Sequence, residues 1–282
     1  MNVSVSGESV LQPEVAPAKY CWLHITFFGL FHLIALISGI YFFSWSALGI
    51  AVVLHWMFGS LGICLGYHRL LSHRSFQVPK LVEYFFATLG ALALQGGPIF
   101  WCGGHRQHHA FTEDVNKDPY SIKRGFWWSH ILWILAPRDE FFQPSHYDAL
   151  APDLSRNAYY QFLDRYFILL QIPLGGLLYL LGGWPFVFYG IFVRAVLLWH
   201  STWFVNSASH YWGNRPYDSD DNARNLWWVA LLTYGEGWHN NHHADPKCAR
   251  AGLQWWQIDM TYWAIALMQR LGMARKVHQS VL

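Results

Sequence analysis

Four long apolar stretches dominate the pattern of hydrophobic and polar positions along the chain. Each is near the roughly 20 residues that a helix needs to cross a bilayer, and they cover residues 22–43, 46–67, 166–183 and 185–205. Ser44 and Trp45 interrupt the first pair, and a Gly-Gly-Trp-Pro run at 182–185 interrupts the second. We therefore expect two transmembrane hairpins. A fifth apolar stretch, residues 84–102, is broken by Gln95 and a Gly-Gly-Pro turn, which predicts an interfacial or half-inserted helix.

The positions of the basic residues predict how the helices are oriented in the membrane. All 19 Lys and Arg lie outside the two hairpin tips, and Arg194 alone lies inside a span. The positive-inside rule then places both termini and the polar segments 69–165 and 206–282 in the cytoplasm. The expected fold is all-α: an integral membrane protein with four transmembrane helices in two hairpins and a cytosolic helical cap. Residues 21–282 form one domain in this interpretation, and residues 1–20 form a flexible extension.

Two segments of the cap carry one-sided aromatic patterns. Residues 153–164 and 253–271 are predicted amphipathic helices, which either lie on the bilayer or pack inside the cap. The pattern leaves both arrangements open.

Composition excludes several other classes of protein. Hydrophobic residues make up 54% of the chain and charged residues only 13%, about half the roughly 25% that is usual in soluble domains. The net charge of +2 gives no sign of nucleic-acid binding. The four cysteines are scattered, which fits buried thiols in a reducing compartment better than a disulfide framework.

Histidine is unusually abundant, with 16 copies, nine of which fall into four groups. The groups are His68 and His73; His105, His108 and His109; His210, four residues after Asn206; and His239, His242 and His243. Residues three and four apart share one face of a helix, so each H-x-x-H-H run predicts three imidazoles directed at one place. Five residues rotate by about 140° on an α-helix. His68 and His73 therefore converge only if the helix ends or bends, or they address different metals.

Neutral imidazole suits iron, copper and zinc. Nine histidines exceed the four ligands of a closed zinc site and suffice for two metals with a position left open. The Asn206 amide could hold a metal-bound water. We interpret the seven ungrouped histidines as structural, namely His24, His32, His55, His130, His146, His200 and His278. Arg194 and Asp164, unusual near the membrane interior, are interpreted in the same way.

These motifs resemble those of the integral-membrane fatty acid desaturases with histidine boxes. The similarity runs from about residue 59 to residue 271, and GYHRLLSHRSF, HRQHH, WFVNSASH and GEGWHNNHH are typical of the Δ9 branch, closest to cyanobacterial and plastid-type acyl-lipid desaturases. The resemblance implies that the nine grouped histidines hold two irons and that Asn206 holds a metal-bound water. It implies no catalytic residue beyond these. The implied reaction introduces a cis double bond into a saturated acyl chain with O2 and two electrons.

The same resemblance gives expectations for the substrate. An apolar tunnel would fix which carbons reach the metals, with Trp101 along it and Trp56 or Met57 closing its far end. Acyl-CoA desaturases carry polar and basic residues at positions where this chain has Gly96, Gly103, Gly104 and only Pro137-Arg138. That favours an acyl chain esterified to a membrane glycerolipid, with acyl-CoA as the alternative.

No haem motif or flavin fingerprint is visible, so electrons are expected from an external donor, ferredoxin or cytochrome b5. A basic cap that includes Arg138, Arg250, Arg275 and Lys276 could dock an acidic donor. The plasma membrane or the thylakoid could hold such an enzyme. Two rivals remain: a hydroxylase or ketolase on the same scaffold, and a metal transporter or sensor.

Overall fold

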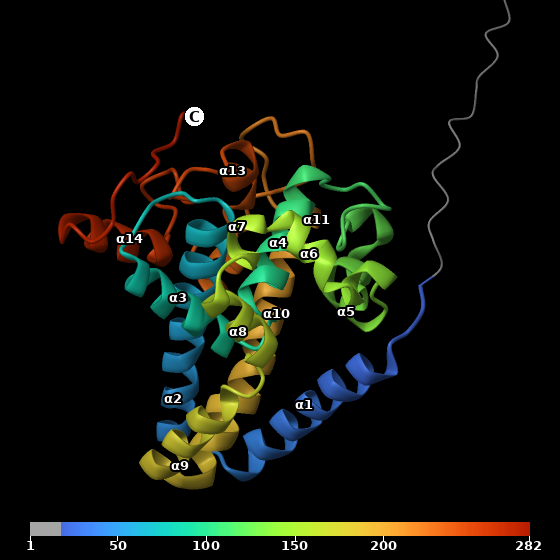
Figure 1. Cartoon of the computed structure of the whole chain (residues 1–282), viewed down its shortest axis with the longest axis vertical. Helices are drawn as coiled ribbons and strands as arrows, with labels where there is room; N and C mark the ends of the chain where they lie inside the picture. Colours follow the sequence, from blue (N-terminus) through green and yellow to red (C-terminus); the bar gives the residue numbers. More distant parts are fainter. Residues whose placement is uncertain (1–17) are drawn as a thin grey trace, which may run out of the picture.

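The structure, a computed structural model, describes residues 18–282 (Figure 1). Most of the extension predicted for residues 1–20 lies outside the described residues. Within them the chain is helical and carries isolated β-bridges but no strand, which agrees with the predicted all-α class.

Three helices in the described part are long and apolar enough to cross a membrane, at Trp22–Tyr41, Trp45–Ser72 and Gln171–Tyr211. The first is α1. The second joins α2 (Trp45–Trp56) to the π-helix η1 (Met57–Ser72). The third contains α9 (Gln171–Val187), η5 (Phe188–Val193), α10 (Arg194–Asn206) and α11 (Ala208–Tyr211).

The third helix holds both of the spans predicted at 166–183 and 185–205. Gly182 and Gly183 have non-helical backbone angles, and Gly183 takes a φ of 66°, in the left-handed region that favours glycine. The chain folds back at this kink, so that residues on its two sides pack together. A Cβ added to Gly190 would lie only 2.6 Å from Leu178 Cδ1. The first of the two predicted spans begins at Gln171 rather than at residue 166, since α8 (Ala158–Tyr166) occupies the preceding residues.

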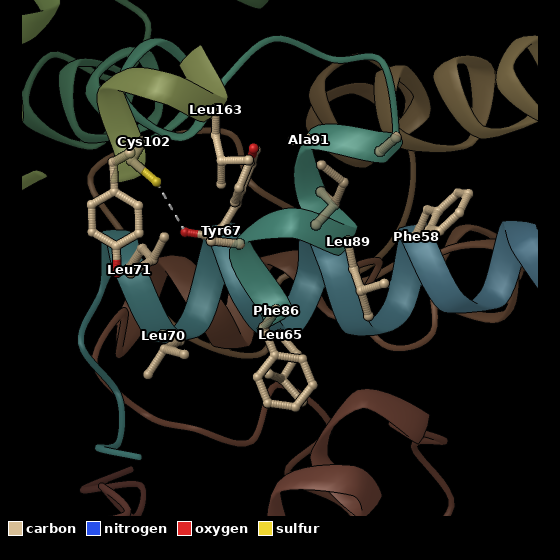
Figure 2. Packing of buried hydrophobic residues seen from close by; sticks show 14 of the residues in the cluster. Phe58, Leu65, Tyr67, Leu70, Leu71, Phe86, Leu89, Ala91, Cys102 and Leu163 are labelled. Carbon is tan, nitrogen blue, oxygen red and sulfur yellow. Dashed lines mark hydrogen bonds between the residues drawn. The ribbon is translucent and has the colours of Figure 1, made fainter. Parts of the chain in front are cut away.

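The helix η1 lies at the centre of the largest cluster of buried hydrophobic residues (Figure 2). It crosses α3 (Lys80–Leu92) at glycines: a Cβ on Gly62 would lie 2.5 Å from the Leu89 carbonyl carbon, and one on Gly66 would lie 2.9 Å from the Phe86 oxygen. The two backbones therefore touch without side chains between them. Leu65, Tyr67, Leu70 and Leu71 of η1 lie in the largest hydrophobic cluster.

The apolar stretch predicted as one interfacial helix is instead two helices. It separates into α3 and α4 (Pro98–Ala110), because Leu94 and Gly96 both adopt positive φ and turn the chain between them. Asp164 Oδ1 then accepts hydrogen bonds from the amides of Ile99 and Phe100, at 3.0 Å each, and so caps the α4 N-terminus. This is the structural role predicted for Asp164.

Shorter helices complete the cap. The segment 153–164 forms α7 (Pro152–Ser155) and α8, and the helical part of 253–271 is α14 (Met260–Arg270). The others are η2 (Ile122–Arg124), η3 (Trp128–Leu132), α5 (Trp133–Leu135), η4 (Asp139–Phe142), α6 (Pro144–Leu150), α12 (Trp227–Leu232) and α13 (His239–Ala244).

Arg194 is fully buried where α10 meets α3 and α9. Its guanidinium donates hydrogen bonds to the carbonyls of Gly190 (2.9 Å) and Leu92 (3.0 Å) and to Gln171 Oε1 (3.3 Å). Buried charge is stable only when it is paired or hydrogen-bonded. These bonds give Arg194 the structural role predicted for it.

Candidate metal centre

The nine grouped histidines converge at one end of the long helices, in two separate groups. The first group is His68, His73, His105, His109 and His242, and the second is His108, His210, His239 and His243. Within each group one nitrogen per imidazole lies within 4.8 Å of the others. Helices η1, α4, α11 and α13 supply the rings, with His73 directly after η1, so four separate segments of the chain build the site (Figure 1).

Each H-x-x-H-H run contributes to both groups, and the prediction that its three imidazoles meet at one place is wrong. On α4, His105 and His109 belong to the first group while His108 belongs to the second. On α13, His239 and His243 belong to the second group while His242 belongs to the first. Residues four apart differ by about 40° around an α-helix, whereas the intervening residue points about 60–100° away. The two groups are adjacent, since the rings of His109 and His243 stack with centroids 4.5 Å apart, and so each helix reaches both groups.

The H-x4-H pair converges because its helix is not an α-helix. A π-helix bonds residue i to i+5, and the His73 amide donates to the His68 carbonyl at 3.1 Å. The two rings therefore lie near one another, with centroids 4.8 Å apart, and both join the first group. We expected His68 and His73 to converge only if their helix ends or bends. The helix is of the π type and ends at Ser72, so the two rings can converge.

Four carboxylates lie close to Nδ1 atoms of the histidines, and none of the four was predicted from the sequence. His108 Nδ1–H donates to Asp118 at 3.0 Å and His243 Nδ1–H donates to Asp221 at 2.5 Å. Glu236 lies 2.9 Å from His68 Nδ1, and Glu113 lies 3.7 Å from His210 Nδ1. A carboxylate at one ring nitrogen fixes the tautomer and leaves the other nitrogen free for a metal. The DP that follows HRQHH and the GEG before the last box were the available signals.

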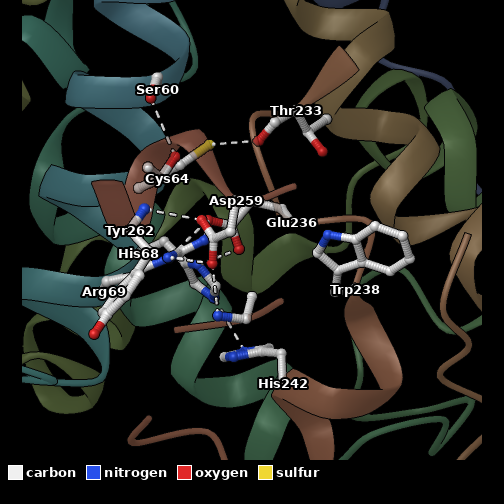
Figure 3. Close-up of polar contacts among 12 residues, drawn as sticks. Ser60, Cys64, His68, Arg69, Thr233, Glu236, Trp238, His242, Asp259 and Tyr262 are labelled. Atoms are coloured by element: carbon white, nitrogen blue, oxygen red, sulfur yellow. Dashed lines mark hydrogen bonds and ion pairs between the residues drawn. The ribbon is translucent and has the colours of Figure 1, made fainter. Parts of the chain in front are cut away.

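Glu236 is itself held by a buried ion-pair network (Figure 3). Arg69 donates to Glu236 Oε1 from Nε (3.1 Å) and Nη2 (3.0 Å), and its Nη1 donates to Asp259 Oδ2 at 3.0 Å. Asp259 Oδ2 also accepts from the Ala251 amide at 2.7 Å. The network connects η1 to the chain on either side of α13, so the fold positions His68 and His242 together.

Metal binding requires neutral imidazoles with a ring nitrogen that is free to coordinate, and the histidines meet both requirements. Burial lowers the pKa of five of them well below 6.5 and that of His243 to about 4; the five are His73, His105, His109, His239 and His242. The rings are therefore neutral at pH 7, as metal ligation requires. His243 Nε2 is buried and makes no hydrogen bond in the described structure, although Nδ1 is bound to Asp221.

A cavity of about 580 Å³ leads to the histidines. His68, His105, His108 and His239 line its inner end together with Asn206, and Trp101 lines its wall. Trp101 also stacks on His105, with ring centroids 5.2 Å apart. Trp56 and Met57 are absent from the lining among the described residues. Trp56 is instead 41% exposed on the outer surface of α2, so this geometry gives no support to a tunnel end at these two positions.

The ungrouped histidines take part in hydrogen bonds away from the two groups. His32 and His200 meet at Nε2, 3.0 Å apart, and His200 Nδ1 lies 3.0 Å from His130 Nε2. His55 Nδ1 lies 2.6 Å from the Tyr234 hydroxyl. These contacts join α1, α2, α10 and the cap, which agrees with the structural interpretation of these residues.

Comparison with known proteins agrees with this geometry. A sequence model described as fatty acid desaturase matches residues 43–275. The chain belongs to this family. It is 68% identical to an sn-2 palmitoyl-lipid 9-desaturase of Nostoc sp. (strain 36) over 92% of this chain and 90% of that protein. It is 50% identical to an sn-1 stearoyl-lipid 9-desaturase of Anabaena variabilis, over 91% and 93%.

A third relative is named for a substrate with a different acyl carrier, coenzyme A. The chain is 44% identical to an acyl-CoA C20 Delta5-desaturase of Anemone leveillei, over 90% of this chain and 80% of that protein. The relatives are therefore named for two acyl carriers, a glycerolipid and coenzyme A.

Proposed function

We propose that this desaturase introduces a cis double bond at the Δ9 position of a saturated acyl chain esterified to a membrane glycerolipid. Two relatives with the highest identity given above are named as lipid-linked 9-desaturases. The apolar cavity that reaches His68, His105, His108 and His239 carries the proposal, because it offers an apolar site beside a metal-binding cluster. The reaction consumes O2, two electrons and two protons for each CH2–CH2 converted to CH=CH, and releases two waters.

The two groups would each hold one iron. Five imidazoles in the first group and four in the second supply the ligands, and Asn206 at the inner end of the cavity would hold a water on the second metal. Bound iron supplies the oxidising power that an unactivated methylene requires, which amino acid side chains cannot provide. Asp118, Asp221 and Glu236 would fix the tautomer and the orientation of the imidazoles that they contact, while burial keeps the rings neutral.

The protein's own residues would place the chain and exclude water. The cavity wall is formed mainly by aromatic and aliphatic side chains, among them Ile63, Phe100, Trp101 and Trp203. A fixed, dry apolar passage determines which carbons approach the histidines. Polar residues of the lining include Asn206, Thr233 and Glu236, the last of which contacts His68.

Charge favours the glycerolipid as carrier. No Lys or Arg appears among the described residues that line the cavity, whereas Asp148, Asp164 and Glu236 do. Coenzyme A carries several phosphate charges, and phosphate recognition in proteins relies on Arg and Lys. A diacylglycerolipid with the palmitoyl chain at sn-2 is the first substrate to test, given the relative at 68% identity.

The proposal includes the orientation and the electron source. Four crossings follow if the kink at Gly182–Gly183 separates two spans, which places both termini and the histidines on the cytoplasmic side of a plasma or thylakoid membrane. Electrons would come from ferredoxin or cytochrome b5.

A fatty acid and lipid-class profile of a desaturase-free host, with and without this gene, tests the proposal. We expect a cis-Δ9 monoene in glycerolipids that is lost in a His239→Ala variant. A monoene that appears first in the acyl-CoA pool would contradict the carrier, and a hydroxylated or oxo product would contradict the reaction.

A further inference from the structure

The cavity that ends at the histidines has an opening on the membrane-facing side of the protein. Among its lining residues, Leu23, Phe142 and Ile168 are also strongly exposed on the outer surface, by 75%, 55% and 48%. The other exposed lining residues are Pro144 and Asp148. A side chain can line a cavity and be exposed only near its mouth. These five residues therefore mark the opening, which we call the lateral opening.

Three elements frame the lateral opening. Leu23 belongs to the first turn of α1, Phe142 to η4, and Ile168 to the short turn between α8 and α9. The start of α1 is fixed beside α5, because the Cys21 amide donates to the Leu135 carbonyl at 2.8 Å and His24 Nδ1–H donates to the Ile134 carbonyl at 2.7 Å. These two hydrogen bonds make the position of α1 beside α5, and with it the lateral opening, a fixed part of the fold.

The depth of the lateral opening matches the membrane–water interface. Leu23 lies in the first turn of α1, beside α5, and Ile168 lies just before the start of α9; Tyr20 and Trp22, next to Leu23 in the chain, are exposed by 60% and 75%. Exposed Tyr and Trp are enriched at this level of a membrane. Glycerol backbones of lipids lie at the same level, with acyl chains below them.

The chemistry of the rim is also that of a lipid site. Exposure of the apolar side chains Leu23, Phe142 and Ile168 to water would cost free energy, whereas contact with lipid acyl chains would not. Its charged members are Asp148 and, just inside, the partly buried Asp164; among the described lining residues there is no cation to hold a nucleotide phosphate.

From these observations we infer that the acyl chain of a membrane diacylglycerolipid enters the cavity sideways, between α1 and the α8–α9 turn, with its glycerol backbone at the interface. The inference rests on the proposed lipid-linked substrate and adds the route. The other chain and the head group stay outside in the bilayer. Substrate then reaches the histidines without leaving the membrane.

The experiment narrows the lateral opening and measures where a lipid chain goes. Metal-loaded full-length protein is placed in phosphatidylcholine nanodiscs that contain a diacylgalactosylglycerol whose palmitoyl chain ends in a diazirine. After photolysis, mass spectrometry maps the cross-linked peptides. The test variant is Leu23→Trp with Ile168→Trp. The matched control is Leu30→Trp with Ile172→Trp, at positions exposed by 50% and 71% on the same two elements or next to them but outside the cavity lining.

Wild type and control should cross-link inside the cavity, at Ile63, Trp199 or Trp203. The narrowed variant should lose those cross-links by about tenfold or more, since two indoles in the opening oppose the chain sterically. Its bound iron and its cross-links on the outer faces should be unchanged, which shows that it is folded. Cavity cross-links that persist in a narrowed, iron-loaded variant would overturn the lateral route.

A second probe separates this inference from the proposed function. Palmitoyl-CoA with the same diazirine is added from solution to wild type. If it labels the cavity while the glycerolipid probe does not, the lipid-linked substrate and the lateral route both fail. If the glycerolipid probe labels the cavity in wild type and also in the narrowed variant, only the route fails.

Discussion

Glu236 lies directly behind His68, with Oε2 2.9 Å from the ring Nδ1. Burial alone would raise the pKa of Glu236, but the adjacent Arg69 and His68 outweigh burial and lower it to about 2. An ionised carboxylate at Nδ1 favours the proton on that nitrogen. His68 Nε2, which faces His242 Nε2 at 3.1 Å, is then free for a metal.

Replacing Glu236 with Gln should weaken the first histidine group. The amide keeps the size of the side chain but can present N–H to His68 Nδ1, which would move the ring proton to Nε2 and block it as a ligand. We expect about 10–100-fold weaker iron binding or activity. Iron content after dialysis against a chelator measures this. Glu140→Gln is the control, because Glu140 pairs with Arg138; equal iron loss in both variants would contradict the positioning role.

Asp221 and Asp220 offer a matched pair for the second group. Asp221 accepts from His243 Nδ1–H, whereas Asp220 is exposed. Asp221→Asn should lower iron affinity by about 10–100-fold, and Asp220→Asn should leave it unchanged. Competition with a colorimetric chelator gives both values. If the two variants bind iron alike, Asp221 has no role in orienting the ring.

The two groups should differ in their tolerance of a lost ligand. His109→Ala leaves four imidazoles in the first group, while His239→Ala leaves three in the second. We expect His239→Ala to lose about one iron of two, and His109→Ala to retain more, because four protein ligands can complete a site. Elemental analysis of purified protein decides this, with His278→Ala as the control. A greater loss in His109→Ala would contradict the assignment of ligands to groups.

Iron uptake should be insensitive to moderate acidification. Burial lowers the pKa of His105 and His109 well below 6.5 and that of His243 to about 4. Because protons bind these rings only at lower pH than free imidazole, they do not compete with metal until the pH falls well below 6.5. Affinity of metal-free protein should therefore be nearly constant between about pH 7.5 and 6. A tenfold fall per pH unit across that range would show that the rings titrate normally.

The crossing of η1 and α3 should not tolerate a methyl group at Gly62. A Cβ there would lie 2.5 Å from the Leu89 backbone, which cannot move as a side chain can. Gly62→Ala should destabilise the protein by about 1–3 kcal/mol and reduce iron loading, since the helix carries His68. Gly49→Ala is the control, with no atom within 4 Å of the added Cβ. Thermal unfolding in detergent compares them; equal melting temperatures would contradict the close crossing.

Several features of the fold followed from local pattern. Apolar runs of about 20 residues can only be satisfied in a membrane as helices, so the helices beginning at Trp22 and Trp45 were predictable. So was the break at Gly182 and Gly183, because adjacent glycines weaken a helix. The π-helical form of η1 had no local signal in the sequence, and neither had the close contact of Gly62 and Gly66 with α3, a segment distant in sequence.

The same division applies to the metal centre. The sequence by itself determined which residues can bind metal, because imidazole chemistry and helical spacing mark the nine histidines without any tertiary information. Only the tertiary structure decided that His108 leaves its neighbours His105 and His109 for a different group, and which carboxylate stands behind which ring. Those outcomes depend on how η1, α4, α11 and α13 pack around the metal centre. The spacing of residues within a single helix does not determine that packing.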